Sequence, residues 1–341
     1  MLLPRSGDPK ELASLVVDLE RVGLDIIWVP EPYGFDAVSM MGYLAGQTSR
    51  IQVGSGILPI YSRTPTLMAM TAAGIDFVSG GRAILGIGAS GPQVIEGWHG
   101  VPYDRPIART AEIIEICRMV LRRERLQYQG DIYTLPLPSD QGTGLGKPLK
   151  MINAPVRSDV PIWVASLGPT NVQMTAATAD GWLPLFFDPA RADGVWGEAL
   201  ERGYSQRSDA LGPLEICAGG DVSIGAGAES HRDRARGEVA LYVGGMGAKG
   251  KNFYNELVRK YGYEREAEEI QDRFLEGNRD RAMAAVPETF LESISLCGSE
   301  GYVRERIAAY HDAGVTVLSI NPVGGDPVRI VEQIATWVHD A

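Results

Sequence analysis

The chain has 341 residues, of which 45% are hydrophobic and 22% are charged, and its formal net charge is −11. This composition is typical of a folded globular protein with a sizeable core. The acidic balance argues against nucleic acid or an anionic membrane as the main partner, although it allows a local basic pocket for a phosphorylated ligand. No apolar run in the sequence is long enough to cross a bilayer.

The cysteines and histidines show no spacing typical of a metal site, so the sequence predicts no bound metal. Three cysteines cannot pair completely, and we expect Cys117, Cys217 and Cys297 to be buried thiols of a cytoplasmic protein. The first residues show no charged leader followed by an apolar segment, so we expect no signal peptide.

Short apolar strands alternate with amphipathic helices along most of the chain. In residues 9–22, apolar side chains recur at three- and four-residue steps, which predicts a helix that Gly23 ends. The same patterns predict helices at 37–48, 65–79, 108–123, 170–179, 228–240, 299–312 and 327–339, and strands at 25–30, 51–57, 83–88, 161–165, 181–186, 214–224 and 315–320.

Two regions depart from this alternation. Residues 124–160 are expected to hold a small hairpin at 127–133 and a loop rich in proline and glycine, and residues 245–296 look like a helical insertion. Seven strands paired with helices and no linker predict one α/β domain over residues 1–341, either a barrel or a doubly wound sheet. An eighth strand would lie at Met1–Pro4, so it is unusually short or the native chain starts upstream.

In a barrel of this type, the active site lies at the carboxyl ends of the strands. Glu31 follows one of these strands and is either a turn residue or a site carboxylate. His99 lies in a loop near another strand end, where it is either a proton donor or an ordinary loop histidine. Tyr61 and Arg63 are expected to be surface residues that cap the next helix, and Arg82 is expected to anchor the barrel floor.

The segment Ser166–Asn171 is a candidate anion site. Gly168 removes a side chain at a strand-to-helix turn, and the free N–H groups at the start of the next helix attract anions. The ordinary alternative is a glycine–proline turn capped by Thr170. Lys249 follows a second glycine-rich stretch, Gly244–Gly247, which either closes over an anionic ligand or belongs to a solvated helical surface.

Gly86, Gly88 and Gly91 match the spacing of a dinucleotide-binding fingerprint. The fingerprint also needs an acidic residue at a strand end about twenty residues later, to contact the ribose. Those positions fall inside the helix expected at 108–123, so the sequence does not favour a Rossmann site.

Taken together, these segments resemble the luciferase-like oxidoreductases, in particular the branch that uses the deazaflavin coenzyme F420. The strongest stretch is Tyr61-x-Arg63-x-Pro65, followed by Asp76, Ser79-Gly80-Gly81-Arg82 and Leu85-Gly86-Ile87-Gly88. Ser90–Trp98 and Tyr242–Gly247 are also similar to one subfamily that uses F420. The resemblance implies a (β/α)₈ barrel, with the helical insertion after strand seven, and a homodimer.

The resemblance also implies a cofactor site. A non-prolyl cis peptide at Gly56–Ile57 would lie against the central ring, Glu31 beside that ring, and the loop Leu167–Asn171 around the phosphate. The expected cofactor-binding residues are Glu31, Gly56, Ile57, Pro59, Ala89, Ser90, Leu167, Gly168, Thr170, Asn171 and Lys249.

Family members that oxidise sugar phosphates carry a histidine where this chain has Pro32, which puts that activity in doubt. The proton donor is then Glu31, Tyr33, His99 or water.

These features support one leading hypothesis and two alternatives. The leading one is an F420-dependent oxidoreductase that transfers a hydride to or from a small organic substrate and reduces an activated C=C, C=N or C=O bond. The first alternative is an FMN-dependent monooxygenase that needs a reductase partner. The second is a barrel that binds a flavin without catalysis. The sequence does not identify the substrate, because pocket side chains come from variable loops.

Overall fold

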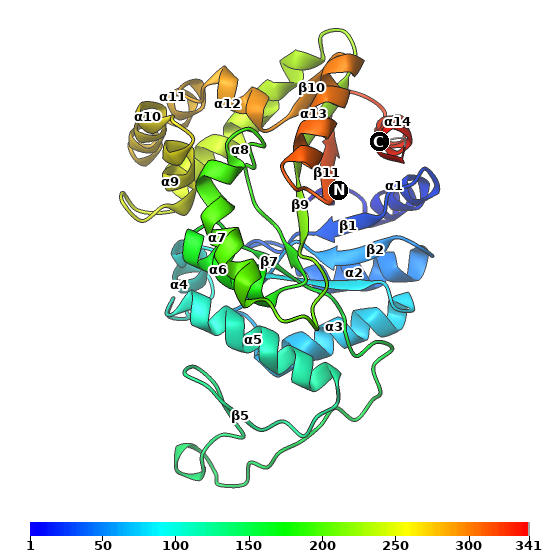
Figure 1. The fold of residues 1–341 in the computed structure, drawn as a ribbon, viewed down its shortest axis with the longest axis vertical. Helices are drawn as coiled ribbons and strands as arrows, with labels where there is room; N and C mark the ends of the chain where they lie inside the picture. The colour runs from blue at the N-terminus through cyan, green and yellow to red at the C-terminus, as the bar shows by residue number, and fades with distance from the viewer. Residues whose placement is uncertain (340–341) are drawn as a thin grey trace.

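Parallel strands form the centre of the molecule, and helices cover their outer side (Figure 1). The computed structural model describes residues 1–339. Hydrogen-bonded neighbours follow the order β1 (Ile26–Val29), β2 (Gln52–Ser55), β4 (Ala83–Gly88), β7 (Ile162–Ala165), β8 (Gly181–Trp182) and β9 (Glu215–Ile224), and β11 (Val317–Pro322) pairs with β9. Every one of these pairings is parallel, which confirms the predicted α/β barrel order.

The N-terminal segment pairs with β1 at the position expected for an additional strand, but only through a single bridge. Leu2 forms a parallel bridge with Trp28 of β1, and the Leu3 N–H donates to the Trp28 carbonyl at 2.8 Å. On its other side, the Leu2 N–H donates to the Asn321 side chain of β11 at 3.3 Å. The N-terminal segment therefore lies between the first and last strands of the sheet.

The helices expected from apolar periodicity are present, with boundaries that differ by one or two residues. They are α1 (Pro9–Arg21), α2 (Ala37–Gln47), α3 (Pro65–Ser79), α5 (Pro106–Leu121), α6 (Pro169–Thr178), α13 (Glu300–Asp312) and α14 (Pro327–His339). Asp8, Asp36 and Thr64 accept backbone hydrogen bonds at the starts of the first three, which explains where those helices begin.

Two helices were missed by the sequence analysis, α4 (Pro92–Gly97) and α7 (Ala192–Gln206). Three glycines weaken the helical signal of α7, and one of them has a packing role. A Cβ at Gly203 would lie 2.5 Å from the Ala176 Cβ, so this glycine lets α7 approach α6 closely. The strand expected at 181–186 is also shorter than predicted and ends at Trp182.

The region after β9 forms a helical lobe at one side of the barrel (Figure 1). The helix expected at 228–240 is a 3-10 segment, η2 (Ala228–Ala235), followed by α8 (Arg236–Ala240) and a π-helical turn, η3 (Leu241–Gly245). The insertion then contains α9 (Phe253–Lys260), α10 (Glu264–Leu275), α11 (Arg279–Ala284) and α12 (Glu288–Ser293). It ends in β10 (Leu296–Gly298), a strand beside β9 that the sequence analysis did not anticipate.

The excursion at 124–160 extends away from the barrel at the bottom of Figure 1. It contains the expected hairpin, as β5 (Tyr128–Gln129) paired with β6 (Thr134–Leu135), and a short helix η1 (Ser139–Gln141). A further two-residue strand, β3 (Leu58–Pro59), pairs with β4 next to the end of β2. This strand begins immediately after the Gly56–Ile57 peptide.

Two tryptophans fill the inside of the barrel. The rings of Trp28 and Trp163 lie 5.3 Å apart. A Cβ at Gly54 would be 2.4 Å from the Trp28 ring, and one at Gly181 would be 2.0 Å from the Trp163 ring. The two glycines therefore leave the space that the indoles occupy inside the barrel.

The floor of the barrel is fixed by Arg82, as the sequence predicted. Its guanidinium donates to the carbonyls of Ile51 at 2.6 Å, Ala45 at 2.9 Å and Thr48 at 3.0 Å. Gly80 ends α3 in the left-handed conformation with φ of 70°, which turns the chain toward β4. The three cysteines are buried and free, as expected. Among the described residues, no helix is both long and apolar enough to span a membrane.

Candidate functional site

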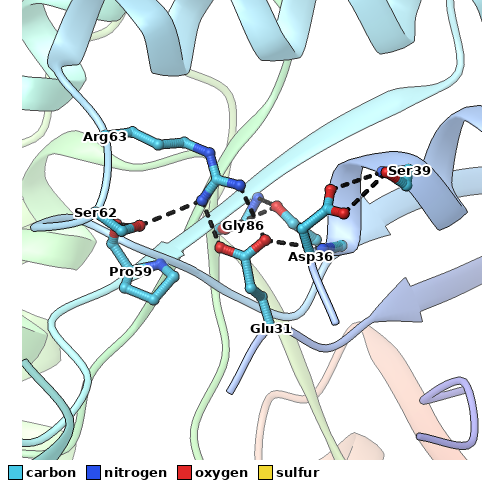
Figure 2. Close-up of polar contacts among 9 residues, drawn as sticks. Glu31, Asp36, Ser39, Pro59, Ser62, Arg63 and Gly86 are labelled. Atoms are coloured by element: carbon cyan, nitrogen blue, oxygen red, sulfur yellow. Dashed lines mark hydrogen bonds and ion pairs between the residues drawn. The ribbon is translucent and has the colours of Figure 1, made fainter. Parts of the chain in front are cut away.

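Glu31 lies just beyond β1, at the carboxyl end of the strands, and forms a two-point ion pair with Arg63 (Figure 2). Arg63 Nη2 donates to Oε2 of Glu31 at 2.9 Å, and Nη1 contacts Oε1. The Ala37 N–H at the start of α2 donates to the same Oε2 at 2.8 Å. Glu31 accepts in all three contacts, an arrangement that suits charge pairing and loop anchoring better than proton donation.

Arg63 does not cap α3, which corrects one expectation from the sequence. Thr64 caps that helix, while Arg63 turns toward β1 (Figure 2). Tyr61 is only 8% exposed, and its hydroxyl donates to the Asp104 carbonyl at 2.8 Å. Burial raises the pKa of the Tyr61 phenol to about 12. Both residues therefore belong to the interior of the barrel mouth, not to its surface.

The peptide between Gly56 and Ile57 is cis, as the family resemblance implied. The preceding residue, Ser55, links β2 to β4, because its hydroxyl donates to the Gly86 carbonyl at 2.8 Å and accepts from the Gly86 N–H at 2.9 Å. A Cβ at Gly88 would lie 3.1 Å from the Ile57 side chain. Glycine at this position therefore lets Ile57 pack closely against β4.

Ala89 and Ser90 follow β4 at the same end of the barrel. Ser90 has a positive φ of 57°, which is uncommon for a residue other than glycine. Its carbonyl accepts a hydrogen bond of 3.4 Å from the Tyr103 hydroxyl. In α4, the Gln93 side chain donates to the Gly245 carbonyl at 3.4 Å, so the two stretches Ser90–Trp98 and Tyr242–Gly247 meet at the mouth.

The start of α6 presents backbone N–H groups without a side-chain cap. Gly168 is the N-cap residue, and among the described residues no side chain caps the helix, so Thr170 is not the cap that the ordinary alternative required. The Thr170 and Asn171 N–H groups belong to the first turn, whose donors have no intrahelical partner. Asn171 Oδ1 is buried and finds no hydrogen-bond partner among the described residues. Phe253 and Lys260 of α9 face this loop.

Two indoles hold the phosphate-loop candidate in place. Trp182 Nε1 donates to the Ser166 carbonyl at 2.9 Å, and Trp196 Nε1 donates to the Leu167 carbonyl at 2.7 Å. The two tryptophan rings pack edge to face, with centroids 5.1 Å apart. Sequence reasoning missed both residues, because Trp182 gave no signal beyond a place in a predicted strand and Trp196 lies in the unanticipated helix α7.

The remaining predicted site residues lie farther out. Tyr33 is 53% exposed, and its ring lies 6.4 Å from that of Trp98. His99 is exposed on the loop after α4. Lys249 is exposed and forms an ion pair with Asp272 of α10, so its charge is directed toward the helical lobe in this structure.

A cavity of about 880 Å³ opens beside Tyr33 at this end of the barrel. Its walls come from the N-terminal segment, the β1–α2 loop, α2 and the π-helical turn η3. The lining residues are Leu3, Pro4, Arg5, Ser6, Gly7, Pro9, Leu12, Val29, Pro30, Pro32, Tyr33, Gly34, Phe35, Asp36, Ser39, Met40, Tyr43, Leu241, Tyr242 and Met246. Of the predicted catalytic residues, only Tyr33 lines this cavity.

Aromatic side chains of the lobe close one side of the mouth. The Tyr242 and Tyr254 rings lie 4.7 Å apart, and both pack edge to face against Phe186. Burial raises the pKa of both tyrosines, so their hydroxyls keep their protons at neutral pH. Sequence analysis singled out Tyr242 only as part of a motif and did not identify the other two.

Comparison with known proteins assigns this barrel to a family. The sequence profile of the luciferase-like monooxygenases matches residues 2–317. The chain belongs to the luciferase-like monooxygenase family. The family resemblance inferred from the sequence is therefore confirmed.

Several relatives of this luciferase-like chain carry names that refer to coenzyme F420 or to reduction. A Mycobacterium tuberculosis protein, assigned provisionally as a coenzyme F420-dependent oxidoreductase, is 37% identical over 328 residues, which cover 94% of this chain and 93% of the relative. A 5,10-methylenetetrahydromethanopterin reductase of Archaeoglobus fulgidus is 28% identical, and the match covers 95% of this chain and 93% of the relative. The luciferase-like chain is thus an enzyme of the oxidoreductase class.

The fold of the luciferase-like barrel is also confirmed by a solved structure. The coenzyme F420-dependent tetrahydromethanopterin reductase of Methanopyrus kandleri superposes with a TM-score of 0.81, and the match covers 100% of this chain and 97% of the other. The two sequences are 23% identical in this alignment, so the likeness bears on the fold alone.

Proposed function

We propose that the protein is a coenzyme F420-dependent oxidoreductase that transfers a hydride between the deazaflavin and a small organic substrate. The observation that carries this proposal is the 37% identity to a relative named for F420, which spans nearly the whole of both chains. The reaction we favour is reduction of an activated C=C, C=N or C=O bond.

The open start of α6 fits the phosphate of this cofactor. The N–H groups of Thr170 and Asn171 would donate to phosphate oxygens, and the partial positive charge of the helix start would add to the attraction. Leu167 and Gly168 would shape the loop, while Trp196 holds its backbone.

The wall that we assign to the ring consists of Gly56, Ile57, Pro59, Ala89 and Ser90. Bound there, the deazaflavin would supply a two-electron hydride donor or acceptor. The paired Glu31 carboxylate would fix the loop beside the ring, since Arg63 and the Ala37 N–H hold it in place. Tyr33, at the edge of the cavity, is our preferred proton donor, with His99 or water as alternatives. Lys249 would need to leave Asp272 to reach an anionic cofactor tail.

A spectral titration tests the cofactor assignment. The purified protein is titrated with F420 and, separately, with FMN, and the absorbance and fluorescence of each cofactor are followed. Saturable F420 binding, with weaker or no FMN binding, is the expected result. Tight FMN binding without F420 binding would overturn the proposal. It would instead favour an FMN-dependent monooxygenase that works with a reductase partner.

We also propose a homodimer in a reducing, cytoplasmic compartment. The three buried free thiols suit such a compartment. An apolar stripe runs along the outer face of α3, where Leu67, Met70, Phe77 and Val78 are 46–74% exposed. An exposed stripe of this kind on a helix is typical of a surface that pairs with another copy.

A further inference from the structure

The 880 Å³ cavity beside β1 has walls that are mostly apolar. Leu3 and Leu12 form one side, Met40 and Tyr43 of α2 form another, and Met246 lies on the side of the helical lobe. This volume falls in the upper part of the range for small-molecule sites, which are typically apolar with a few polar groups.

The charged groups of the cavity are few. Among the described residues that line it, Arg5 is the only cation and Asp36 is the only anion. Asp36 caps α2, because its carboxylate accepts from the Ser39 N–H at 2.9 Å and from the Ser39 hydroxyl at 2.8 Å. Arg5, an exposed residue, is the single cation that this lining offers. A phosphorylated substrate would need several free cations, which this lining does not offer.

Aromatic rings surround the entrance. Phe35 is 88% exposed and Tyr33 is 53% exposed, and both line the cavity. Trp98, 66% exposed, adds a third ring next to Tyr33. Exposed aromatic groups at the rim of an apolar pocket provide contact area for a large, flat or branched apolar ligand.

We propose that this cavity is the substrate site and that it binds an uncharged, bulky and largely apolar compound with one polar group. A neutral ketone or enone has this chemistry. Its oxygen would meet Arg5 and the Tyr242 hydroxyl, and its apolar body would lie among Met40, Tyr43 and Met246. The proposal rests on the proposed function for the reaction, but the binding itself does not depend on the cofactor.

Calorimetric titration of the full chain tests the assignment with two probes of opposite character. Progesterone is a neutral polycyclic enone, and glucose 6-phosphate is a polar dianion. Each is titrated into wild type and into Met40→Lys, Tyr33→Lys and Leu275→Lys, with and without F420. Met40 and Tyr33 line the cavity, whereas Leu275 is 55% exposed at the end of α10 and serves as the matched control. Tyr33 is already exposed, so its variant keeps the test valid should Met40→Lys fail to fold.

We expect progesterone to bind wild type and glucose 6-phosphate not to bind. Met40→Lys should weaken progesterone binding about tenfold or more, because its charge would be buried against the ligand. Tyr33→Lys should weaken it because the variant removes an aromatic ring from the rim. Leu275→Lys should bind as wild type does. The proposal is overturned if wild type prefers glucose 6-phosphate, binds neither probe, or loses progesterone equally in all three variants. If progesterone binds and F420 does not, the proposed function is refuted but the substrate-site proposal stands.

Discussion

Arg63 and Glu31 form a nearly buried ion pair that connects the loop after β1 to the loop after β3. The Arg63 side chain is 13% exposed and that of Glu31 is 11% exposed. Glu31 follows β1, while Arg63 lies between β3 and α3, so the pair fixes the position of two loops at once (Figure 2). Because the guanidinium engages both carboxylate oxygens, it also fixes the orientation of the acid.

Replacing Arg63 with methionine should destabilise the fold. The substitution leaves a carboxylate with little solvent and no cation, and removing one partner of a buried pair is costly. Since this pair keeps some exposure, we expect a loss of about 2–3 kcal/mol in the free energy of unfolding. Urea denaturation at neutral pH measures it.

The matched control for this variant is Arg202→Met. Arg202 also pairs with a glutamate, Glu198, but the two side chains are 57% and 80% exposed. Exposed pairs of this kind contribute about 0.5 kcal/mol or less. Equal losses in the two variants would contradict a special role for Arg63.

An acidic group at the start of α6 should weaken cofactor binding. In Asn171→Asp, a carboxylate would repel the phosphate that we place at this helix start. The same carboxylate suits the first turn of a helix, so the fold should keep its stability. We expect the F420 dissociation constant to rise about tenfold or more, which corresponds to about 1.4 kcal/mol.

Gln206→Glu provides the control for this effect. It makes the same change from amide to carboxylate at the exposed C-terminal end of α7, so the net charge changes equally. Fluorescence titration with F420 should give a wild-type affinity for this variant. If Asn171→Asp also binds as wild type does, the phosphate does not lie at α6.

Local sequence patterns predicted most of the framework of the barrel. Apolar periodicity placed α1, α3 and α13 within two residues, because each buries one apolar stripe against the sheet. The pattern failed for α7, whose glycines serve close packing against α6 and lower its helical signal. It also failed after Trp182, because β8 ends there and Phe186 packs against Tyr242 of the helical lobe.

The site was predictable only where a local motif carries it. The cis peptide at Gly56–Ile57 was anticipated through the family resemblance, whereas the phosphate role of the loop Leu167–Asn171 stays a prediction. The Arg63–Glu31 pair joins residues 32 positions apart, and the cavity brings Arg5 together with Tyr242 from the far end of the chain. Contacts of this kind depend on the closure of the barrel, so local sequence patterns cannot predict them.

A charge on the outer face of α3 should disrupt self-association. Phe77 is 74% exposed toward the C-terminal end of the apolar stripe, so Phe77→Glu would place a carboxylate inside the proposed interface. We expect wild type to behave as a dimer and the variant as a monomer in size-exclusion chromatography with light scattering. Leu275→Glu, at an exposed position on α10, should leave the dimer intact. A wild-type monomer would refute the proposed homodimer.

Glu20 should give the fold a measurable acid sensitivity. This residue is 9% exposed at the floor of the barrel, where one carboxylate oxygen accepts from the N–H groups of Ser49, Arg50 and Ile51 at 2.9, 2.6 and 2.8 Å. Burial opposes ionisation, but the three donors and the Arg50 charge outweigh it and hold the pKa of Glu20 below its ordinary value of 4.5. The unfolded chain then binds this proton more readily than the folded one.

The sign of the effect follows from that difference. Stability from Glu20 is fully present above pH 4.5 and is lost as the pH falls below 4.5 through the folded-state pKa. Glu20→Gln keeps an acceptor but removes the charge, so it should cost about 1–2 kcal/mol at neutral pH. The difference in the free energy of unfolding between Glu20→Gln and wild type should narrow as urea denaturation is repeated down to about pH 3. Glu305→Gln, an exposed change on α13, should have the same free energy of unfolding as wild type at every pH. A difference between Glu20→Gln and wild type that does not change with pH would contradict the depressed pKa of Glu20.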